Sequence, residues 1–341
     1  MAKITIKDVA KAANVDLSTV SRVLNSSFDT HKYTTATIER VKNAAEELGY
    51  KPSVAARSLR TGKTMLLGLI VADISNPFFS TIASHLDNAI GKQGYRLVIS
   101  STNESPKRQR GHIEGMIAQG VDGLIVAPCG SDGLEKAYQT KTPLVTIDRP
   151  LNNVEIPFVG LDNIAAGQLL AKKLIHCGCE SIGVVMPESK TDQTVQERLS
   201  GMESELKKNN RSLSWILTVP PASFLSDTLR KTVVDKLKKT DTYPDAIVGM
   251  TNISTIGIIK ALEELNIAWG DNIGLAGIDD FTAAPIVSPA VSVVSQPLQH
   301  IAQSAFSLLL EYMESKKRYQ EGKILRVKPL WLERSSLLHR R

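Results

Sequence analysis

The sequence is short of the features that mark membrane proteins and secreted proteins. No run of about 18 apolar residues occurs in the chain, and residues 1–11 contain no apolar stretch of the kind that forms a secretory signal. Only three cysteines are present, Cys129, Cys177 and Cys179, and their odd number and spacing fit no disulfide framework. We therefore expect a cytoplasmic protein that makes no contact with a membrane.

Motifs for catalysis and for metal binding are scarce as well. The chain has no dinucleotide-binding fingerprint, no phosphate-binding loop, no Gly-x-Ser-x-Gly elbow and no set of kinase motifs. His176 precedes Cys177-Gly178-Cys179, but these cysteines lack the two-residue gap of common zinc sites, and no second ligand pair follows. We expect no enzyme activity, no catalytic residue, no bound metal and no cofactor.

The composition and the distribution of charge indicate a globular protein with a basic end. Hydrophobic residues make up 42% and charged residues 22% of the 341 residues, which suits two or three folding units. Residues 1–63 contain 11 Lys or Arg against 6 Asp or Glu, whereas the rest of the chain contains 30 against 29. Nearly all of the net charge of +6 therefore lies in the first fifth of the chain. A basic end on a near-neutral body indicates a polyanionic partner.

Two short helices separated by a tight turn are predicted at the N-terminus. Thr5 can cap the first helix, with Asp8 as its capping-box partner, and Asn14 is a plausible end. Asp16 can cap the second helix, which we expect to cover residues 17–25. Two helices joined in this way are typical of a helix-turn-helix motif.

The second of these helices carries the candidate DNA-reading side chains. Its apolar residues share one side, which leaves Leu17, Ser18, Ser21 and Arg22 on an outward surface. In a major groove Arg22 can bind guanine, Ser18 a base edge or a phosphate, and Leu17 a thymine methyl group. Three amphipathic helices that bind nothing are the alternative, but the basic charge and the tight turn favour DNA binding.

A third helix and a short hinge are expected to complete the headpiece. The third helix is predicted from Ala36 to Leu48, capped by Thr34 or Thr35 and closed by Gly49. Residues 53–59 can form only two helical turns, which are unstable alone in water because helix nucleation is costly. We expect this hinge to become helical only against DNA and a second copy of the chain; a plain linker is the alternative.

From Met65 onward, short apolar runs alternate with amphipathic stretches. The expected strands are Leu66–Ala72, Arg96–Ser100, Gly123–Ala127, Leu144–Ile147, Ser181–Met186, Trp215–Val219, Ala246–Met250 and Ile273–Ile278. The expected helices include Phe79–Gly91, Gln109–Gln119, Asn163–Leu174, Val195–Lys208 and Thr255–Leu265. This alternation predicts parallel sheets covered on both faces and arranged as two lobes. In such folds ligands bind at the carboxyl ends of the strands.

Three segments closely resemble the lactose–galactose repressor (LacI/GalR) family. Residues 5–15 and 18–25 match the headpiece signature of that family, and residues 44–59 match its third helix and hinge. The body resembles the family's sensor module, which is similar to periplasmic sugar-binding proteins. One departure is the stretch from Ser26 to Tyr33, which is longer than is usual between the second and third helices. Phosphate contacts in that loop are therefore not carried over.

The resemblance implies a fold and an arrangement of domains. The fold class is an all-α helix-turn-helix headpiece followed by an α/β two-lobed, periplasmic-binding-protein-like core with parallel doubly wound sheets. The implied domains are residues 1–50 for the headpiece, 51–64 for the hinge helix and linker, and 65–341 for effector binding and dimerisation. Within the body, the N-lobe is expected at about residues 65–161 and 292–323, and the C-lobe at about 162–291 and 324–341.

The resemblance also implies a function and a set of DNA contacts. We expect a transcriptional repressor that binds a near-palindromic double-stranded DNA operator as a homodimer and responds to a small-molecule effector. Leu59 is expected to wedge between base pairs in the minor groove, with Arg57 and Arg60 at phosphates. The residues expected to contact DNA are Thr5, Lys7, Leu17, Ser18, Thr19, Ser21, Arg22, Asn25, Arg57, Leu59 and Arg60.

Strand-end residues of the body match effector contacts of the family. They are Asp73, Asn76, Phe78, Phe79, Asp148, Arg149, Asp162, Arg198, Asn252, Asp279 and Gln296. Asn76 would offer hydrogen bonds, and Phe78 or Phe79 an aromatic face for a sugar ring. The alternatives are structural, because Asp and Asn at strand ends often only cap helices and an aromatic pair is as often core.

One departure from the sugar-binding relatives bears on the charge of the effector. Asn252 is followed by Ile253, where those relatives usually have Asp, so one carboxylate suited to sugar hydroxyls is missing. Arg149 and Arg198 are then expected to have less acidic company, which favours an anionic effector such as a sugar acid or a phosphorylated sugar. A neutral sugar is the alternative.

Two other functions remain open at this point. An architectural DNA-bending protein with a purely structural body predicts DNA affinity that no metabolite changes. An enzyme attached to a DNA tether predicts turnover of the ligand, although no catalytic constellation is visible in the sequence.

Overall fold

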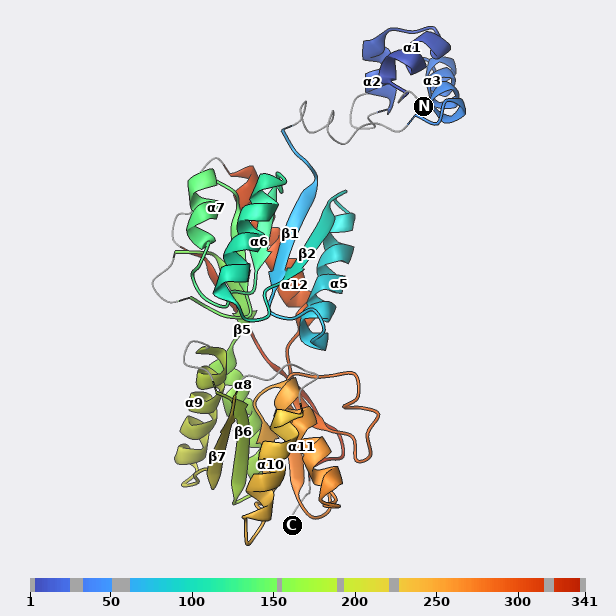
Figure 1. The fold of residues 1–341 in the computed structure, drawn as a ribbon. Coiled ribbons are helices and arrows are strands. Elements are labelled where there is room, and N and C mark those ends of the chain that lie inside the picture. The colour runs from blue at the N-terminus through green and yellow to red at the C-terminus, as the bar shows by residue number, and fades with distance from the viewer. Residues whose placement is uncertain are drawn as a thin grey trace. The chain divides into compact units, whose positions relative to one another are not determined.

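The chain divides into two compact units, Met1–Thr64 and Met65–Arg341. The structure, a computed structural model, describes residues 4–24, 33–50, 62–151, 155–188, 193–220, 227–315 and 322–337. The first unit contains the headpiece, and the second contains one parallel and one mostly parallel sheet with their covering helices (Figure 1). The expected combination of an all-α headpiece with a two-lobed α/β core is thus confirmed.

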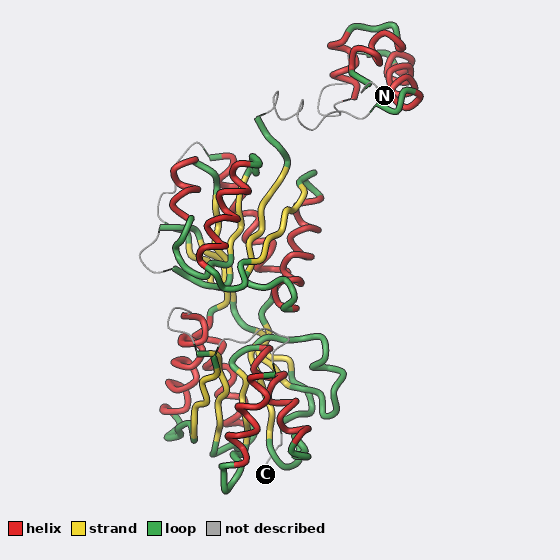
Figure 2. The backbone as a smooth tube through the Cα atoms, viewed as in Figure 1, coloured by secondary structure: helices red, strands yellow, loops and turns green. Residues whose placement is uncertain are grey.

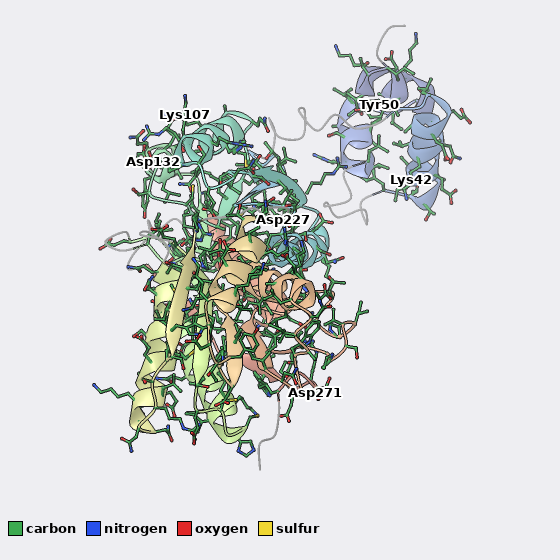
Figure 3. All side chains as sticks on the ribbon, turned by 60° about the horizontal axis from the view of Figure 1, so that its bottom comes forward. Lys42, Tyr50, Lys107, Asp132, Asp227 and Asp271 are labelled. Carbon is green, nitrogen blue, oxygen red and sulfur yellow. The ribbon has the colours of Figure 1, made fainter. Side chains whose placement is uncertain are left out.

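Three helices form the headpiece: α1 (Ile6–Ala13), α2 (Leu17–Leu24) and α3 (Thr35–Glu47). One apolar residue from each, Val9, Val20 and Val41, is fully buried at the centre. Exposed side chains such as that of Lys42 project from the outer surface of the unit (Figure 3). A core of this size stabilises only a small domain, so the ends of the helices contribute appreciably to its stability.

The expected capping box of α1 is present. Asp8 Oδ2 accepts hydrogen bonds from the Thr5 backbone N–H at 2.8 Å and from the Thr5 hydroxyl at 2.7 Å. Asn14 ends the helix in the left-handed conformation at φ 48°. Thr34 caps α3 by accepting from the Thr37 N–H, which decides between the two candidate caps.

Thr5 holds the pKa of the Asp8 carboxyl below its usual value, first through its backbone N–H and then through its hydroxyl. Because the folded-state pKa is lowered, this stabilisation is present above the unfolded value near 3.8 and is lost as the pH falls through the folded value. In Asp8→Asn we expect faster hydrogen exchange in residues 4–13 than in the wild type at pH 7. The difference should shrink only as the pH falls below 3.8 and through the lowered pKa of the wild-type carboxyl, which is then protonated as well. Glu39→Gln, on the exposed side of α3, serves as the control. An effect of Asp8→Asn that stays constant as the pH is lowered until the wild-type carboxyl is protonated would contradict the prediction.

The first lobe of the body is built on a six-stranded, all-parallel sheet in the order β11-β5-β4-β3-β1-β2. Its strands are β1 (Leu66–Val71), β2 (Arg96–Ser101), β3 (Gly123–Val126), β4 (Leu144–Ile147), β5 (Phe158–Leu161) and β11 (Ile324–Val327). Helices α5 (Pro77–Gly91) and α12 (Leu298–Glu314) pack on one face, and α6 (Pro106–Ala118) and α7 (Leu134–Thr140) on the other (Figure 1). Helices on both faces explain why every residue of β3, β4 and β5 is buried.

The second lobe repeats this plan with a sheet in the order β12-β10-β9-β8-β6-β7. Its strands are β6 (Ile182–Pro187), β7 (Trp215–Val219), β8 (Ala246–Gly249), β9 (Gly274–Ile278), β10 (Ser292–Ser295) and the antiparallel β12 (Leu330–Leu332). Helices α8 (Asn163–His176) and α9 (Gln193–Lys208) pack on one face, and α10 (Thr228–Lys238) and α11 (Asn252–Glu264) on the other.

The chain passes between the two sheets three times, after β5, after β10 and after β11 (Figure 2). This differs from the expected lobe boundaries. Residues 292–295 were placed in the N-lobe, but β10 pairs with β9 in the second sheet. Residues 324–327 were placed in the C-lobe, but β11 pairs with β5 in the first sheet. Both strands lie next to a crossing point, so strand pairing, which is a long-range property, decides their lobe.

Candidate DNA-binding and ligand-binding sites

The outward surface of α2 is formed by the residues that the sequence predicts. Val20 and Val23 are buried, whereas Ser18 and Arg22 are exposed and Leu17 has 44% of its surface exposed. Thr19 and Ser21 are half-buried, and Thr5 and Lys7 are exposed near the start of α1. An exposed apolar side chain beside a hydroxyl and a guanidinium offers groups that fit a thymine methyl, a phosphate and a guanine.

Tyr33 is a residue of this surface that sequence reasoning missed. The Arg22 Nη1 donates a hydrogen bond to the Tyr33 hydroxyl at 3.2 Å. Tyr33 ends the long stretch between α2 and α3, so the lengthened connection supplies a group that orients Arg22. Asn25, Arg57, Leu59 and Arg60, together with most of that stretch, lie outside the described residues.

The loop after β1 holds its polar side chains in local turns. Asp73 Oδ1 accepts from the Ser75 N–H at 2.9 Å and from the Ser75 hydroxyl at 2.7 Å. Asn76 caps α5, and its Oδ1 accepts from the Phe78 N–H at 3.1 Å. Asp73 and Asn76 therefore have structural roles at this strand end.

Phe78 and Phe79 lie in the hydrophobic core of the first lobe, with 7% and 4% of their surfaces exposed. Their rings pack edge to face with centroids 4.9 Å apart. Because Pro77 starts α5, both rings fall in its first turn and turn inward. The expectation that one of them offers a free face to a sugar ring is thus not supported, and the core alternative holds.

An ion pair joins the loops after β2 and β4. Arg149 donates from Nη1 to Glu104 Oε2 and from Nη2 to Glu104 Oε1, each at 2.7 Å. Asp148, which precedes it at φ 66°, has a carboxylate oxygen 3.5 Å from Arg149 Nε. The expectation that Arg149 has little acidic company is wrong. Glu104 is distant in sequence and supplies the missing carboxylate.

The second lobe contains a buried polar network centred on Arg198, which has 3% of its surface exposed. Its Nε donates to Asn163 Oδ1 at 2.9 Å, and its Nη1 donates to the Met250 carbonyl at 2.8 Å and to Asp279 Oδ2 at 3.2 Å. Gln296 donates to Asp279 Oδ1 at 2.6 Å. Three of the predicted effector residues, Arg198, Asp279 and Gln296, are joined in this network. Asp162 and Asn252 make other contacts.

Two glycines allow Arg198 to reach Asn163. A Cβ atom at Gly167 of α8 would lie 1.9 Å from the Arg198 carbonyl oxygen, and one at Gly201 of α9 would lie 2.1 Å from the Ile164 carbonyl oxygen. Any side chain at either position would push α8 and α9 apart. The close packing of these helices therefore depends on glycine and places the start of α8 beside Arg198. Asp162 caps α8 by accepting from the Ala165 N–H at 2.9 Å.

Between the described residues of the two lobes there are polar contacts at two places. Asn252, at the start of α11, donates from Nδ2 to Asn76 Oδ1 at 2.8 Å. Arg326 of β11 donates to both carboxylate oxygens of Glu197 at 2.7 and 3.0 Å, and this carboxylate raises the pKa of the Arg326 guanidinium. Glu197 and Arg326 were not predicted as site residues, since neither follows a strand end.

A groove of about 760 Å³ opens beside α5 and the start of α12. Among the expected effector residues it contains only Gln296, and neither Arg149 nor Arg198 lines it. We therefore place the candidate ligand site at the strand ends rather than in this groove. Among the described residues, no three His, Cys, Asp or Glu side chains are grouped to hold a metal ion.

Comparisons with known proteins decide the family. Residues 5–53 match the profile of bacterial regulatory proteins of the lacI family, and residues 67–317 match that of the periplasmic binding protein domain. The chain is 31% identical over 322 residues to the HTH-type transcriptional repressor PurR of Vibrio vulnificus strain CMCP6, covering 92% of this chain and 93% of the relative. The chain belongs to the lacI family of bacterial regulatory proteins.

Further relatives agree with this assignment. The HTH-type transcriptional regulator PtxS of Pseudomonas plecoglossicida is 29% identical over 313 residues, covering 92% of this chain and 90% of the relative. The Lac repressor dimer bound to operator and the anti-inducer ONPF has a TM-score of 0.85 at 20% identity, covering 99% of this chain and all of that one, which shows a shared fold.

As a member of the lacI family, the protein is a DNA-binding transcriptional regulator with a ligand-binding sensor domain. Its relatives are regulators and not enzymes, which confirms the expectation drawn from the missing catalytic motifs. Within the described part of the chain, no helix has the length and apolar character needed to span a bilayer.

Proposed function

We propose that this lacI-family regulator is a repressor whose operator affinity is controlled by a small sugar-type metabolite bound between the two lobes. The observation that carries the proposal is the hydrogen bond from Asn252 to Asn76. Asn252 is the first residue of α11, after β8, and Asn76 caps α5 in the loop after β1, so the ligand-binding edges of both sheets face each other there. The buried network of Arg198 and Asp279 lies at the same edge of the second sheet.

The residues that we propose as ligand contacts follow from this placement. Arg149, which pairs with Glu104, belongs to the first lobe, and Arg198, Asn252, Asp279 and Gln296 belong to the second. Each arginine already has a carboxylate partner, so the missing Asp after Asn252 does not by itself favour an anionic ligand. Arginine–carboxylate pairs bind hydroxyl groups as well as acids, which keeps both ligand classes open.

A calorimetric titration of the full chain with neutral sugars, sugar acids and sugar phosphates tests the proposal. We expect binding of one class, lost in Asn252→Ala and unchanged in Asn210→Ala, an exposed asparagine after α9. Tight binding of neutral sugars alone would exclude an anionic effector. No binding in any class, or equal binding in Asn252→Ala, would exclude a sugar site between the lobes.

We also propose that the repressor acts as a homodimer on a near-palindromic operator. Two headpieces that read two half-sites need two-fold symmetry, and the Lac repressor of similar fold is a dimer bound to its operator. Ile286 supports a subunit contact, because 76% of its surface is exposed and it follows Pro285, which lines the groove beside α5.

Replacing Ile286 with glutamate should shift the protein from dimer to monomer at micromolar concentration. A charge at an apolar subunit contact must be desolvated without a partner, which costs several kcal/mol on binding. Sedimentation velocity gives the oligomeric state, with Ile216→Glu, another exposed isoleucine on the edge strand β7, as the control. A dimer of unchanged stability in Ile286→Glu would place the subunit contact elsewhere.

A further inference from the structure

The Glu104–Arg149 ion pair spans the carboxyl edge of the first sheet. Glu104 follows β2 and Arg149 follows β4, and the sheet order places β3 and β1 between those strands. The two loops thus start three strand spacings apart, or roughly 14 Å. The pair closes this distance with two hydrogen bonds of 2.7 Å.

The position of the pair is also the position at which a ligand is expected. From β1 the chain moves to β2 on one side and then returns to β3 on the other side. The direction of winding therefore reverses between β1 and β3, and doubly wound sheets bind ligands in the crevice at such a reversal. Glu104 and Arg149 flank this crevice from its two sides.

The two members of the pair differ in their exposure. The Arg149 side chain has 19% of its surface exposed, and the Glu104 side chain has 46% exposed. Arg149 also pairs with Asp148, whose carboxylate lies 3.5 Å from its Nε. The guanidinium is therefore held in place with its Nη atoms toward Glu104. The more exposed glutamate can turn into solvent once its two hydrogen bonds are broken.

The backbone on both sides of the pair is strained. Asn103 and Glu104 adopt the left-handed conformation in succession, with φ 50° and 58°. Asp148, at φ 66°, is spanned by a hydrogen bond of 2.7 Å from the Arg149 N–H to the Ile147 carbonyl, which is the rare form of γ-turn. Strain of this kind is concentrated at ligand-binding sites in proteins.

We propose that Glu104 is an exchangeable internal occupant of the Arg149 fork, and that a ligand carboxylate takes its place. Glu104 then determines whether the site prefers an anionic or a neutral ligand, and the preferred ligand is a sugar acid. This inference rests on the proposed function, because it assumes a ligand between the lobes.

The exchange is favourable on chemical grounds. An incoming carboxylate makes the same two charge-assisted hydrogen bonds with Arg149 that Glu104 makes, so Arg149 is never left unpaired. The displaced Glu104 is already half exposed and regains full hydration at small cost. A neutral polyol cannot replace the carboxylate in this way. It must bind with the pair intact and gains nothing from the removal of Glu104.

The test compares Glu104→Gln with the wild-type chain in calorimetric titrations. The probes are D-gluconate and D-glucuronate, each with its neutral counterpart, D-glucitol and D-glucose. We expect at least a tenfold gain in affinity of Glu104→Gln for an acid, since the competing charge is gone, and no gain for the neutral counterpart. Glu311→Gln removes one charge from an exposed ion pair with Lys323 in the same lobe and is the matched control.

The outcomes separate this inference from the proposed function. No gain for either acid, or an equal gain for acid and neutral counterpart, overturns the exchange. A gain that Glu311→Gln reproduces also overturns it, because net charge would then be the cause. If Glu104→Gln gains acid affinity but no probe changes DNA binding, the exchange stands and the proposed sensor function fails. A thermal unfolding midpoint close to that of the wild type shows that the variant is folded.

Discussion

Replacing Arg198 with alanine should destabilise the second lobe by about 3–5 kcal/mol, the usual cost of breaking a buried ion pair. Arg198 has 3% and Asp279 has 7% of the surface exposed, so the aspartate would remain buried without its partner. Asn163 and the Met250 carbonyl would lose their donors at the same time. No other single replacement in the described body removes a buried charge with this many contacts.

The tryptophans give a direct measurement of this effect. The chain has three, and all of them, Trp215, Trp269 and Trp331, belong to the second lobe. Urea unfolding followed by tryptophan fluorescence therefore reports the lobe that contains Arg198. Glu333→Gln, which removes one charge from the more exposed pair with Lys173 in the same lobe, should change the free energy of unfolding by less than about 0.5 kcal/mol.

The charge and packing parts of the Arg198 effect can be separated. The double variant Arg198→Ala with Asp279→Asn should lose less unfolding free energy than the two single variants lose together, because no unpaired charge is left. If Arg198→Ala costs less than about 1 kcal/mol, the pair is solvated and the network is not a structural centre of the lobe. Arg198→Lys keeps the positive charge but loses the planar guanidinium. Loss of ligand binding in this variant would show that ligand recognition depends on the geometry of the guanidinium.

Replacing Arg22 with alanine should abolish sequence-specific DNA binding by the headpiece. One bidentate contact with guanine contributes about 1–3 kcal/mol, so two half-sites would lose about 2–6 kcal/mol. Arg22 is exposed on α2 and oriented by the Tyr33 hydroxyl, so it needs little rearrangement to enter a groove. Tyr33→Phe removes only the orienting hydrogen bond and should cost no more than about 1.5 kcal/mol.

Fluorescence anisotropy with an operator selected from random DNA measures both losses. Lys42→Ala removes the same charge from the exposed side of α3 and is the matched control. Arg22→Ala should lower affinity for the selected operator far more than affinity for random DNA. An equal loss on both would make Arg22 a phosphate contact and would contradict its role in base recognition.

The headpiece was predictable because its determinants are local. The capping box of Thr5 and Asp8, the left-handed Asn14 and the buried valines all lie within one or two turns of each other. The same holds for the eight expected strands, whose ends differ from the prediction by at most one residue. Burial on both faces makes the central strands β1, β3, β6 and β8 continuous apolar runs, and the half-exposed edge strands β2 and β7 are still short apolar stretches between turn residues.

The long-range features could not be predicted in this way. β11 is half-exposed, contains Arg326 and belongs to the first sheet only because it pairs with β5. Glu104 and Arg149 lie 45 residues apart and meet because two loops converge at one edge of a sheet. The sequence therefore indicated which residues follow strands, but not which of these residues form ion pairs with one another. The mistaken expectation that Arg149 and Arg198 have less acidic company has this cause.

The central claim is that a ligand between the lobes controls DNA binding by the headpiece. Its most direct test is the operator affinity of the full chain, measured by anisotropy with and without a saturating ligand identified by calorimetry. We predict at least a fivefold change in dissociation constant, the lower end of ordinary allosteric coupling, and its loss in Asn252→Ala. A ligand that binds between the lobes and leaves operator affinity unchanged would contradict the account.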